Sequence, residues 1–143
     1  MNRNHCGCQG RSQDQGPDQL VVNIQSAVQN NTNFRTVLWT RQNLQLTLMC
    51  IPVGSDIGVE LHEDVDQFIR IVSGCALVKT GCNQDSLSRQ QQGDGNYALM
   101  IPAGTWHNIV NVGNVPLKLY SVYAPPKHPF GTIHKTKANA LHE

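Results

Sequence analysis

The chain has 143 residues, of which 39% are hydrophobic and 15% charged, and its formal net charge at pH 7 is +1. This length suits one domain with a hydrophobic core, and the near-neutral charge gives no reason to expect nucleic acid or an anionic membrane as a partner. No apolar stretch is long enough to span a bilayer. The first residues lack the apolar segment of a secretory signal. We therefore expect a cytoplasmic protein.

Residues 1–18 are rich in Gln, Asp, Gly and Asn and predict a disordered arm. Residues 20–24 predict a short strand, and residues 26–30 predict a helical turn with Ser26 as its N-cap. The chain has five cysteines, an odd number. In a reducing compartment this number favours free thiols over a disulfide framework.

The rest of the chain is typical of short strands separated by turn residues. The expected strands cover residues 34–40, 44–51, 68–72, 76–79, 97–101, 107–112 and 117–123. Residues 83–96 predict a polar loop, and residues 127–143 predict a polar tail with solvated histidines and a short helix at 135–141. With no long helix, this pattern predicts an all-β sandwich or jelly-roll barrel over residues 19–126.

Two segments hold candidate metal ligands. Glu60 and His62 are two residues apart, so an extended chain places both side chains on one face. His107 follows the turn Pro102-x-Gly104 at the start of an expected strand. If the two segments are neighbours in a barrel, the carboxylate and the imidazoles can converge, and they are ligands that suit Zn, Fe, Mn or Ni.

The spacing of these residues resembles the two sequence motifs of the cupin superfamily. The first motif has a glycine, five residues, His-x-His, three or four residues, Glu, six residues and a second glycine. Here Gly54 and Gly74 enclose Glu60-x-His62 and Gln67 at the same spacing. Glu60 stands in place of the first histidine, and Gln67 stands in place of the glutamate.

The second cupin motif matches at Pro102, Gly104, His107 and Asn111, with its leading glycine one residue early at Gly95. The resemblance covers about residues 44–124. The stretches DQFIRI, IPAGTWHN and PLKLYSVYAPP are similar to a bacterial cupin group often labelled mannose-6-phosphate isomerase-like.

The resemblance implies a small jelly-roll barrel with a divalent transition metal in its mouth. Its ligand positions map onto Glu60, His62, Gln67 and His107. Compared with three histidines and one carboxylate, this set keeps one negative charge and replaces one imidazole with an amide oxygen. That change favours harder metals such as Mn²⁺ or Fe²⁺ over Zn²⁺ or Ni²⁺. Alternatively, Gln67 orients a water or His62 without binding the metal.

Other residues near the motifs have supporting roles in this interpretation. Asp66 is a reserve ligand beside the pocket, and Trp106 either forms a pocket wall or packs at the barrel rim. Asn111 is expected to hold a turn or strand through its amide. No residue is identified as a catalytic base.

Three functions remain open at this point. The first is a metal-binding cupin acting on a small polar molecule, most concretely a sugar or sugar-phosphate isomerase. The second is an iron-dependent dioxygenase, and the third is a non-catalytic cupin for ligand binding or assembly. Barrels of this family commonly dimerise, so we also expect a homodimer, with residues 20–24 and 34–39 as candidate contacts.

Overall fold

The computed structural model describes residues 13–141. The strands are β1 (Arg35–Thr40), β2 (Gln45–Ile51), β3 (Asp66–Ser73), β4 (Cys75–Gly81), β5 (Arg89–Asp94), β6 (Ala98–Ile101), β7 (Trp106–Asn111), β8 (Leu117–Ala124) and β9 (Ile133–His134). Two short helices, α1 (Ile24–Asn30) and α2 (Lys137–Leu141), complete the described part. No helix within it is long and apolar enough to cross a membrane.

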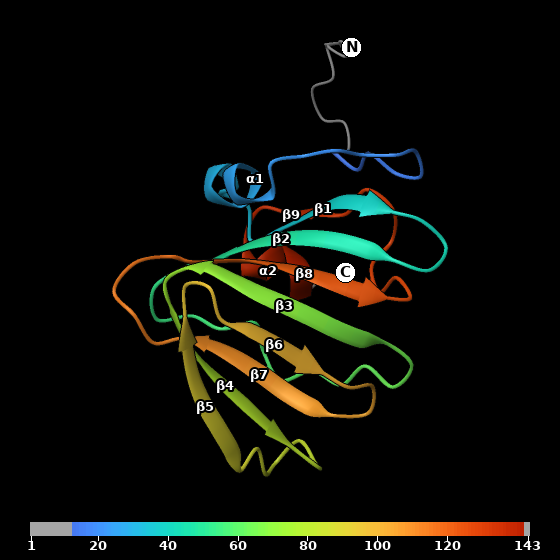
Figure 1. Ribbon diagram of the computed structural model, residues 1–143. Helices are drawn as coiled ribbons and strands as arrows, with labels where there is room; N and C mark the ends of the chain where they lie inside the picture. The colour runs from blue at the N-terminus through green and yellow to red at the C-terminus, as the bar shows by residue number, and fades with distance from the viewer. Residues whose placement is uncertain (1–12, 142–143) are drawn as a thin grey trace.

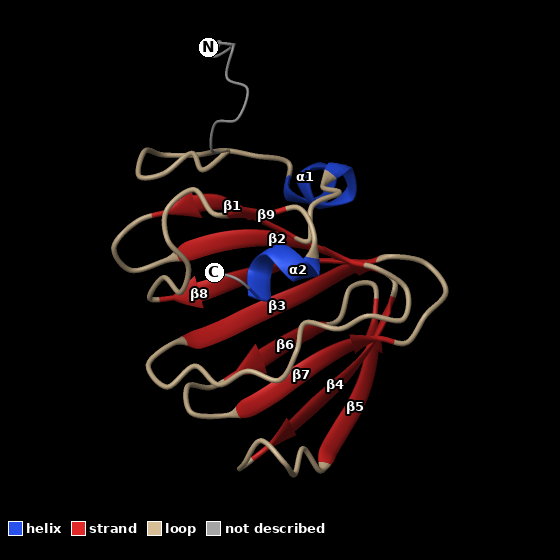
Figure 2. Cartoon of the chain, turned by 180° about the vertical axis from the view of Figure 1, so that it is seen from behind, coloured by secondary structure: helices blue, strands red, loops and turns tan. Residues whose placement is uncertain are grey.

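The strands form two antiparallel sheets that face each other (Figures 1 and 2). The larger sheet has the order β6-β3-β8-β2-β1-β9, and the smaller has the order β5-β4-β7. Each sheet joins strands that are consecutive in the chain, such as β1 with β2 and β4 with β5, to strands from distant parts of it, as in the pairing of β3 with β8. This is a jelly-roll fold, and it confirms the all-β barrel predicted from the strand and turn pattern and implied by the motif resemblance.

Strand β8 shows why the sequence folds in this way. Its residues alternate strictly between buried and partly exposed, with Leu117, Leu119, Ser121 and Tyr123 all buried. Successive side chains of a strand point to opposite faces, so these four residues line the barrel interior. Their order along the strand runs from apolar to polar.

Cross-strand pairing extends this order to the whole interior. What we call the apolar half holds buried aliphatic side chains: Met49, Ile51, Ile69, Ile71, Ile109, Leu117 and Leu119. What we call the polar half holds buried residues with polar groups: Gln45, Thr47, His62, Gln67, His107, Ser121 and Tyr123. Burial of each large aliphatic side chain contributes about 1.5–3 kcal/mol to folding. The apolar half is therefore the main source of stability.

The expected strand at residues 20–24 is wrong. Residues 20–23 are irregular, and α1 begins at Ile24 with Asn23 as its N-cap. The Asn23 side-chain oxygen accepts a hydrogen bond from the N–H of Ser26 at 3.0 Å, which satisfies one free donor of the first helical turn. Val21 is 86% exposed, so the apolar run has no interior to pack against.

The expected polar loop at residues 83–96 contains strand β5, which is an edge of the smaller sheet. Five of its six residues are exposed and only Gly93 is buried. An edge strand with so little burial needs no apolar alternation, which is the signal on which strand prediction depends. Strand β5 matters for function, because it carries Arg89, an exposed residue that lines a cavity described below.

Segments expected to lie outside the barrel are in contact with it at both ends. Near the N-terminal end, the Asp14 carboxylate accepts hydrogen bonds from the Thr40 hydroxyl at 2.6 Å and the Gly131 N–H at 3.0 Å. Strand β9 of the expected tail pairs with β1, and Ala140 of α2 packs on the hydrophobic core. Residues 1–12 of the predicted arm lie outside the described residues.

Two histidines of the expected solvated tail are buried. His128 is 9% exposed and His134 is 6% exposed. The backbone of His128 is held by the Gln45 side chain, which accepts its N–H at 2.9 Å and donates to its carbonyl at 2.7 Å. His142 lies outside the described residues.

The cysteines within residues 13–141 are free, as expected. Cys75 is the first residue of β4, and Cys82 follows the last residue of the same strand. Since the two residues lie at opposite ends of one strand, they do not face each other across a turn.

Candidate metal centre

The two ligand segments are tied together through their backbones. Glu60 and His107 form an antiparallel bridge, with N–H to carbonyl distances of 2.8 and 3.0 Å. The N–H of Gly104 donates to the carbonyl of His62 at 2.8 Å. Gly104 has φ +82°, a conformation that favours glycine, so the turn before β7 requires this residue. The Pro-x-Gly turn thus anchors the first segment as well as placing His107.

The structure brings Glu60, His62 and His107 together. The Glu60 Oε1 atom lies 3.3 Å from His62 Nε2 and 3.7 Å from His107 Nε2. One ligand atom from each residue can be chosen so that all lie within 4.8 Å of one another. The two imidazoles are buried, whereas the Glu60 side chain is 27% exposed. The group therefore reaches solvent through its carboxylate.

The hydrogen bond of His107 determines which ring nitrogen is free. Its Nδ1 lies 3.0 Å from the carbonyl oxygen of Thr105, which can only accept. Nδ1 therefore carries the proton, and in the neutral ring Nε2 presents a lone pair toward Glu60. A histidine that donates its second nitrogen to a carbonyl is the usual arrangement of a metal ligand.

The carboxyl of Glu60 is ionised at neutral pH. Burial acts to raise its pKa, but the adjacent imidazoles of His107 and His62 and the positive charge of Arg35 oppose burial. Their combined effect holds the pKa of Glu60 well below its usual value of 4.5. The site therefore combines one negative charge with two imidazole nitrogens.

Gln67 lies on the inner face of β3 and is 5% exposed. Its Nε2 donates to the Ser121 hydroxyl at 3.2 Å, whereas its Oε1 is buried without a hydrogen-bond partner. The amide is thus oriented by Ser121 and keeps its oxygen available. This arrangement suits either direct coordination or a hydrogen bond to a bound molecule.

These donors suit a divalent cation. Both imidazole Nε2 atoms and the Gln67 Oε1 atom are buried without hydrogen-bond partners, and an unsatisfied buried polar atom costs about 1–3 kcal/mol. Metal–ligand bonds of about 2.0–2.2 Å place neighbouring donor atoms roughly 3–3.5 Å apart, close to the observed separations of the Glu60 oxygen from the imidazole nitrogens. The residues present therefore fit a bound transition metal.

Two residues expected beside the pocket, Asp66 and Trp106, lie outside the group of Glu60, His62 and His107. Asp66 is exposed, and its Oδ1 accepts the N–H of Ala103 at 2.8 Å. It therefore supports the turn before β7 and is not part of the ligand group. Trp106 precedes His107 on β7, so its side chain points to the opposite face of the strand. Asn111 holds a turn as expected, because its amide bonds to the carbonyls of Ile51 and Val115 and to the N–H of Gly113.

Sequence reasoning missed Tyr123 as a neighbour of the site. Its ring packs edge-on against His62 at 5.9 Å and against His128 at 5.3 Å between centroids. Burial raises the pKa of Tyr123 to about 12, so its hydroxyl is protonated at neutral pH. The alternation of β8 could have found this residue, because Tyr123 shares the parity of Leu117 and Leu119.

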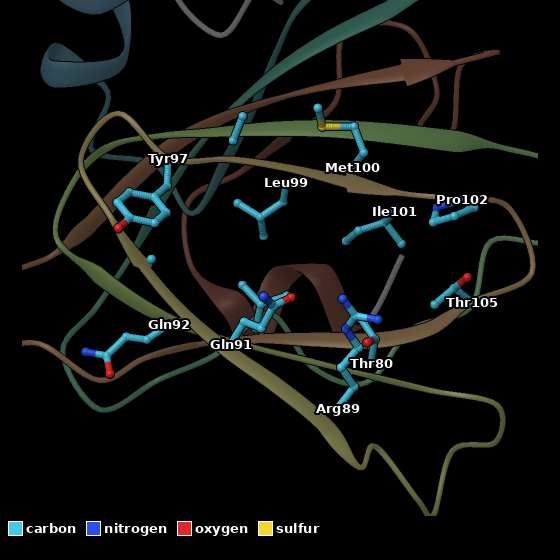
Figure 3. Close-up of a pocket in the computed structure, with 13 residues that line it drawn as sticks. Thr80, Arg89, Gln91, Gln92, Tyr97, Leu99, Met100, Ile101, Pro102 and Thr105 are labelled. Atoms are coloured by element: carbon cyan, nitrogen blue, oxygen red, sulfur yellow. The ribbon is translucent and has the colours of Figure 1, made fainter.

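A cavity of about 530 Å³ is lined by residues of β4, β5 and β6, and none of the candidate ligands lines it (Figure 3). Its wall includes Thr80 and Ile101. Thr80 is the direct cross-strand partner of His107, and Ile101 is the partner of Gln67. Directly paired residues have Cβ atoms about 4.5–5.5 Å apart on the same face, so the cavity adjoins the site on both sheets.

Comparison with known proteins agrees with the fold. Residues 47–123 match the family model described as "Cupin domain". The chain therefore belongs to the cupin family. It is 54% identical to the uncharacterized protein YrkC of Bacillus subtilis over 128 residues, which cover 90% of this chain and 69% of that protein. It is 42% identical to the uncharacterized protein L612 of Acanthamoeba polyphaga mimivirus over 114 residues, which cover 79% of this chain and 69% of that protein.

Among solved structures, the chain is similar to BH2720 from Bacillus halodurans, with 53% identity and a TM-score of 0.90. The match covers 92% of this chain and 99% of that one. None of these three names states an activity. The comparisons thus establish the family and the fold, and the chemistry must be argued from the site.

Proposed function

We propose that this cupin is a metal-dependent enzyme acting on a small polar molecule, most concretely an isomerase of a sugar or sugar-like substrate. The observation that carries the proposal is the group of Glu60, His62 and His107, whose imidazole nitrogens are buried without hydrogen-bond partners around an ionised carboxylate. Glu60, His62 and His107 would hold the metal, with Gln67 Oε1 as a further ligand.

A metal at this position would supply a Lewis acid that polarises a carbonyl or binds a diol. The chain's own residues would orient the substrate and move protons. Tyr123, protonated at neutral pH because its pKa is raised to about 12, can donate a hydrogen bond but cannot serve as the base. Glu60 can bind metal or accept a proton but not easily both, so metal content decides its role.

The test is elemental analysis of untagged protein, as isolated and after incubation with Mn²⁺, Fe²⁺, Ni²⁺ or Zn²⁺. The expected result is nearly one metal ion per chain in the wild type and none in a His62→Ala, His107→Ala double variant. The matched control is Glu63→Gln, which changes an exposed glutamate of the same segment and should keep the metal. A wild-type protein that takes up no metal would overturn the proposal and favour a non-catalytic binding cupin.

A second candidate is an iron-dependent dioxygenase, because two histidines and one carboxylate are the ligands of many non-haem iron oxygenases. Glu60, His62 and His107 have this composition. Iron as the isolated metal, together with oxygen uptake that is absent from the zinc-loaded protein, would favour this reading. Turnover under anaerobic conditions would favour the isomerase.

We also propose that the protein is a homodimer. On the outer face of the larger sheet, Met100 pairs with Phe68, Phe68 with Val122, and Val122 with Leu46. Met100 is 72% exposed, so this apolar row is open to solvent at the edge of the sheet. Contiguous exposed apolar surface favours association. Sedimentation equilibrium checks the proposal, and a mass of one chain would contradict it.

A further inference from the structure

The strand register of the smaller sheet places a positively charged side chain, that of Arg89, in the same cross-strand row as His107. Arg89 of β5 pairs with Thr80 of β4, and Thr80 pairs with His107 of β7. Directly opposite residues in a sheet point to the same face. Neighbouring strands lie about 4.8 Å apart, so the backbone of Arg89 lies about 10 Å from that of His107. All three side chains therefore lie on the inward face of the smaller sheet, with His107 buried, Thr80 half-buried and Arg89 exposed at the sheet edge.

The Arg89 side chain lines the cavity that adjoins the ligand group. Figure 3 shows it together with Thr80 on one wall, at the end of the cavity away from Tyr97. Arg89 is the one charged residue among the described residues that line this space. It also forms no ion pair with a carboxylate within residues 13–141. Its charge is therefore available to an anion that enters the cavity.

The two walls of the cavity differ in chemistry. The wall on β4 and β5 carries groups that form hydrogen bonds, from Thr80, Arg89 and Gln91, whereas the wall on β6 carries the aliphatic side chains of Leu99 and Ile101. A volume of about 530 Å³ is within the range of small-molecule sites. The space suits a small molecule with one anionic group and a partly apolar skeleton.

We infer that Arg89 binds the carboxylate of a small organic acid and thereby directs the rest of that acid toward Glu60, His62 and His107. This inference rests on the proposed function and names its substrate class. A guanidinium can hold a carboxylate through two parallel hydrogen bonds. One positive charge matches one carboxylate, whereas a phosphate dianion would keep an unmatched charge. The substrate of the isomerase reading is then a sugar acid rather than a sugar phosphate.

The test is a ligand titration monitored by ¹H–¹⁵N NMR. The ligands are gluconate as the carboxylate, glucose as the neutral analogue and glucose 6-phosphate as the dianion. Gluconate should shift the amide signals of Thr80, Arg89, Gln91 and Thr105, and glucose should not. Arg89→Gln should weaken gluconate binding about 10-fold or more, because hydrogen bonds to a charged group are lost. Arg89→Lys should weaken it less.

The matched control is Arg70→Gln, because Arg70 bonds to Asn96 at 2.6 Å and does not line the cavity. Its gluconate affinity should equal that of the wild type. Equal affinity of Arg89→Gln and the wild type would overturn the inference, as would tighter binding of glucose 6-phosphate than of gluconate. So would a lack of gluconate binding at tens of millimolar to a wild-type protein whose amide spectrum shows it is folded.

The same titration on the His62→Ala, His107→Ala variant separates this inference from the proposed function. Arg89 belongs to β5, and its pairing with Thr80 does not depend on the metal ligands. If the variant binds gluconate and the wild type holds no metal, the anion site stands and the metal-dependent function fails. If the wild type holds metal but binds no gluconate, the metal-dependent function stands and the anion site fails.

Discussion

The apolar half and the polar half of the barrel interior are built from the same strands but have different roles. In β8, Leu117 and Leu119 lie opposite apolar side chains of β2 and β3. Ser121 lies opposite Thr47 and Ile69, and Tyr123 lies opposite two glutamines. The apolar half uses all of its buried surface for folding. The polar half keeps buried atoms without partners, which costs stability and leaves them available for ligands. Stability and function are thus separated along the length of single strands.

A finer comparison lies within the polar half, where two glutamines flank Tyr123. Gln45 and Gln67 both pair with Tyr123 in the sheet, and both are at most 5% exposed. The Gln45 oxygen accepts two backbone N–H groups, from Lys127 and His128, and its nitrogen donates to the His128 carbonyl. The Gln67 oxygen accepts none. Gln45 is therefore structural, whereas Gln67 keeps an unsatisfied buried oxygen that a ligand can use.

The largest expected effect comes from the apolar half. Leu119→Ala should lower the free energy of unfolding by about 2–5 kcal/mol, because it leaves a cavity in a fully buried site. Metal content per folded chain should not change. Urea denaturation and elemental analysis check the two quantities. Val115→Ala, at a residue that is 48% exposed, is the control and should change stability by less than about 0.5 kcal/mol. Loss of metal from folded Leu119→Ala protein would show that the apolar half also supports metal binding and contradict the separation of stability from function.

The glutamine pair gives the next largest effect. Gln45→Leu should cost at least about 2 kcal/mol of unfolding free energy, because it leaves backbone groups of Lys127 and His128 without partners. Gln67→Leu should cost less, about 1 kcal/mol, because it loses one hydrogen bond, to Ser121, and also removes a buried oxygen that is already unsatisfied. It should instead lower metal affinity about 10- to 100-fold, the range for residues that bind or support a metal.

Denaturation and competitive metal titration with a chelator measure both glutamine variants. The comparison fails if Gln45→Leu and Gln67→Leu lose stability equally. It also fails if Gln67→Leu binds metal as tightly as the wild type.

Per pH unit, the smallest expected change in stability is a pH dependence from His128. Burial, followed by the positive charge of Arg35, lowers its pKa from 6.5 to about 3. Between these two values the unfolded chain binds a proton that the folded chain does not. The free energy of unfolding should therefore fall as the pH drops from 6.5 toward 3, by up to about 1.4 kcal/mol per pH unit.

Urea denaturation of metal-free protein across this window checks the pH dependence. His128→Gln should flatten the slope, because the variant removes the group whose pKa differs between the two states. Its stability near pH 7, where His128 is neutral in the folded state and mostly neutral in the unfolded state, is the internal reference. Equal slopes for the variant and the wild type would contradict the assignment.

Much of the site could be predicted from the sequence because its geometry is local. The two-residue spacing places Glu60 and His62 on one face, and the turn at Pro102 and Gly104 places His107 at the start of β7. Alternation in residues 117–123 likewise predicts a strand with a buried face. Each of these signals depends on neighbours within a few positions along the chain.

The sequence by itself determined that the chain forms a cupin barrel and which residues can gather as metal ligands. Only the tertiary structure decided that Arg89 lies on the same face of the smaller sheet as His107 and lines the cavity, because this depends on the pairing of β5 with β4. It also decided that His128 is buried, since the side chain of Gln45, far away in sequence, binds its backbone. The physical reason is the same in both cases. Cross-strand pairs and long-range hydrogen bonds join residues that lie in polar segments of the sequence, where no alternation of apolar residues signals a strand.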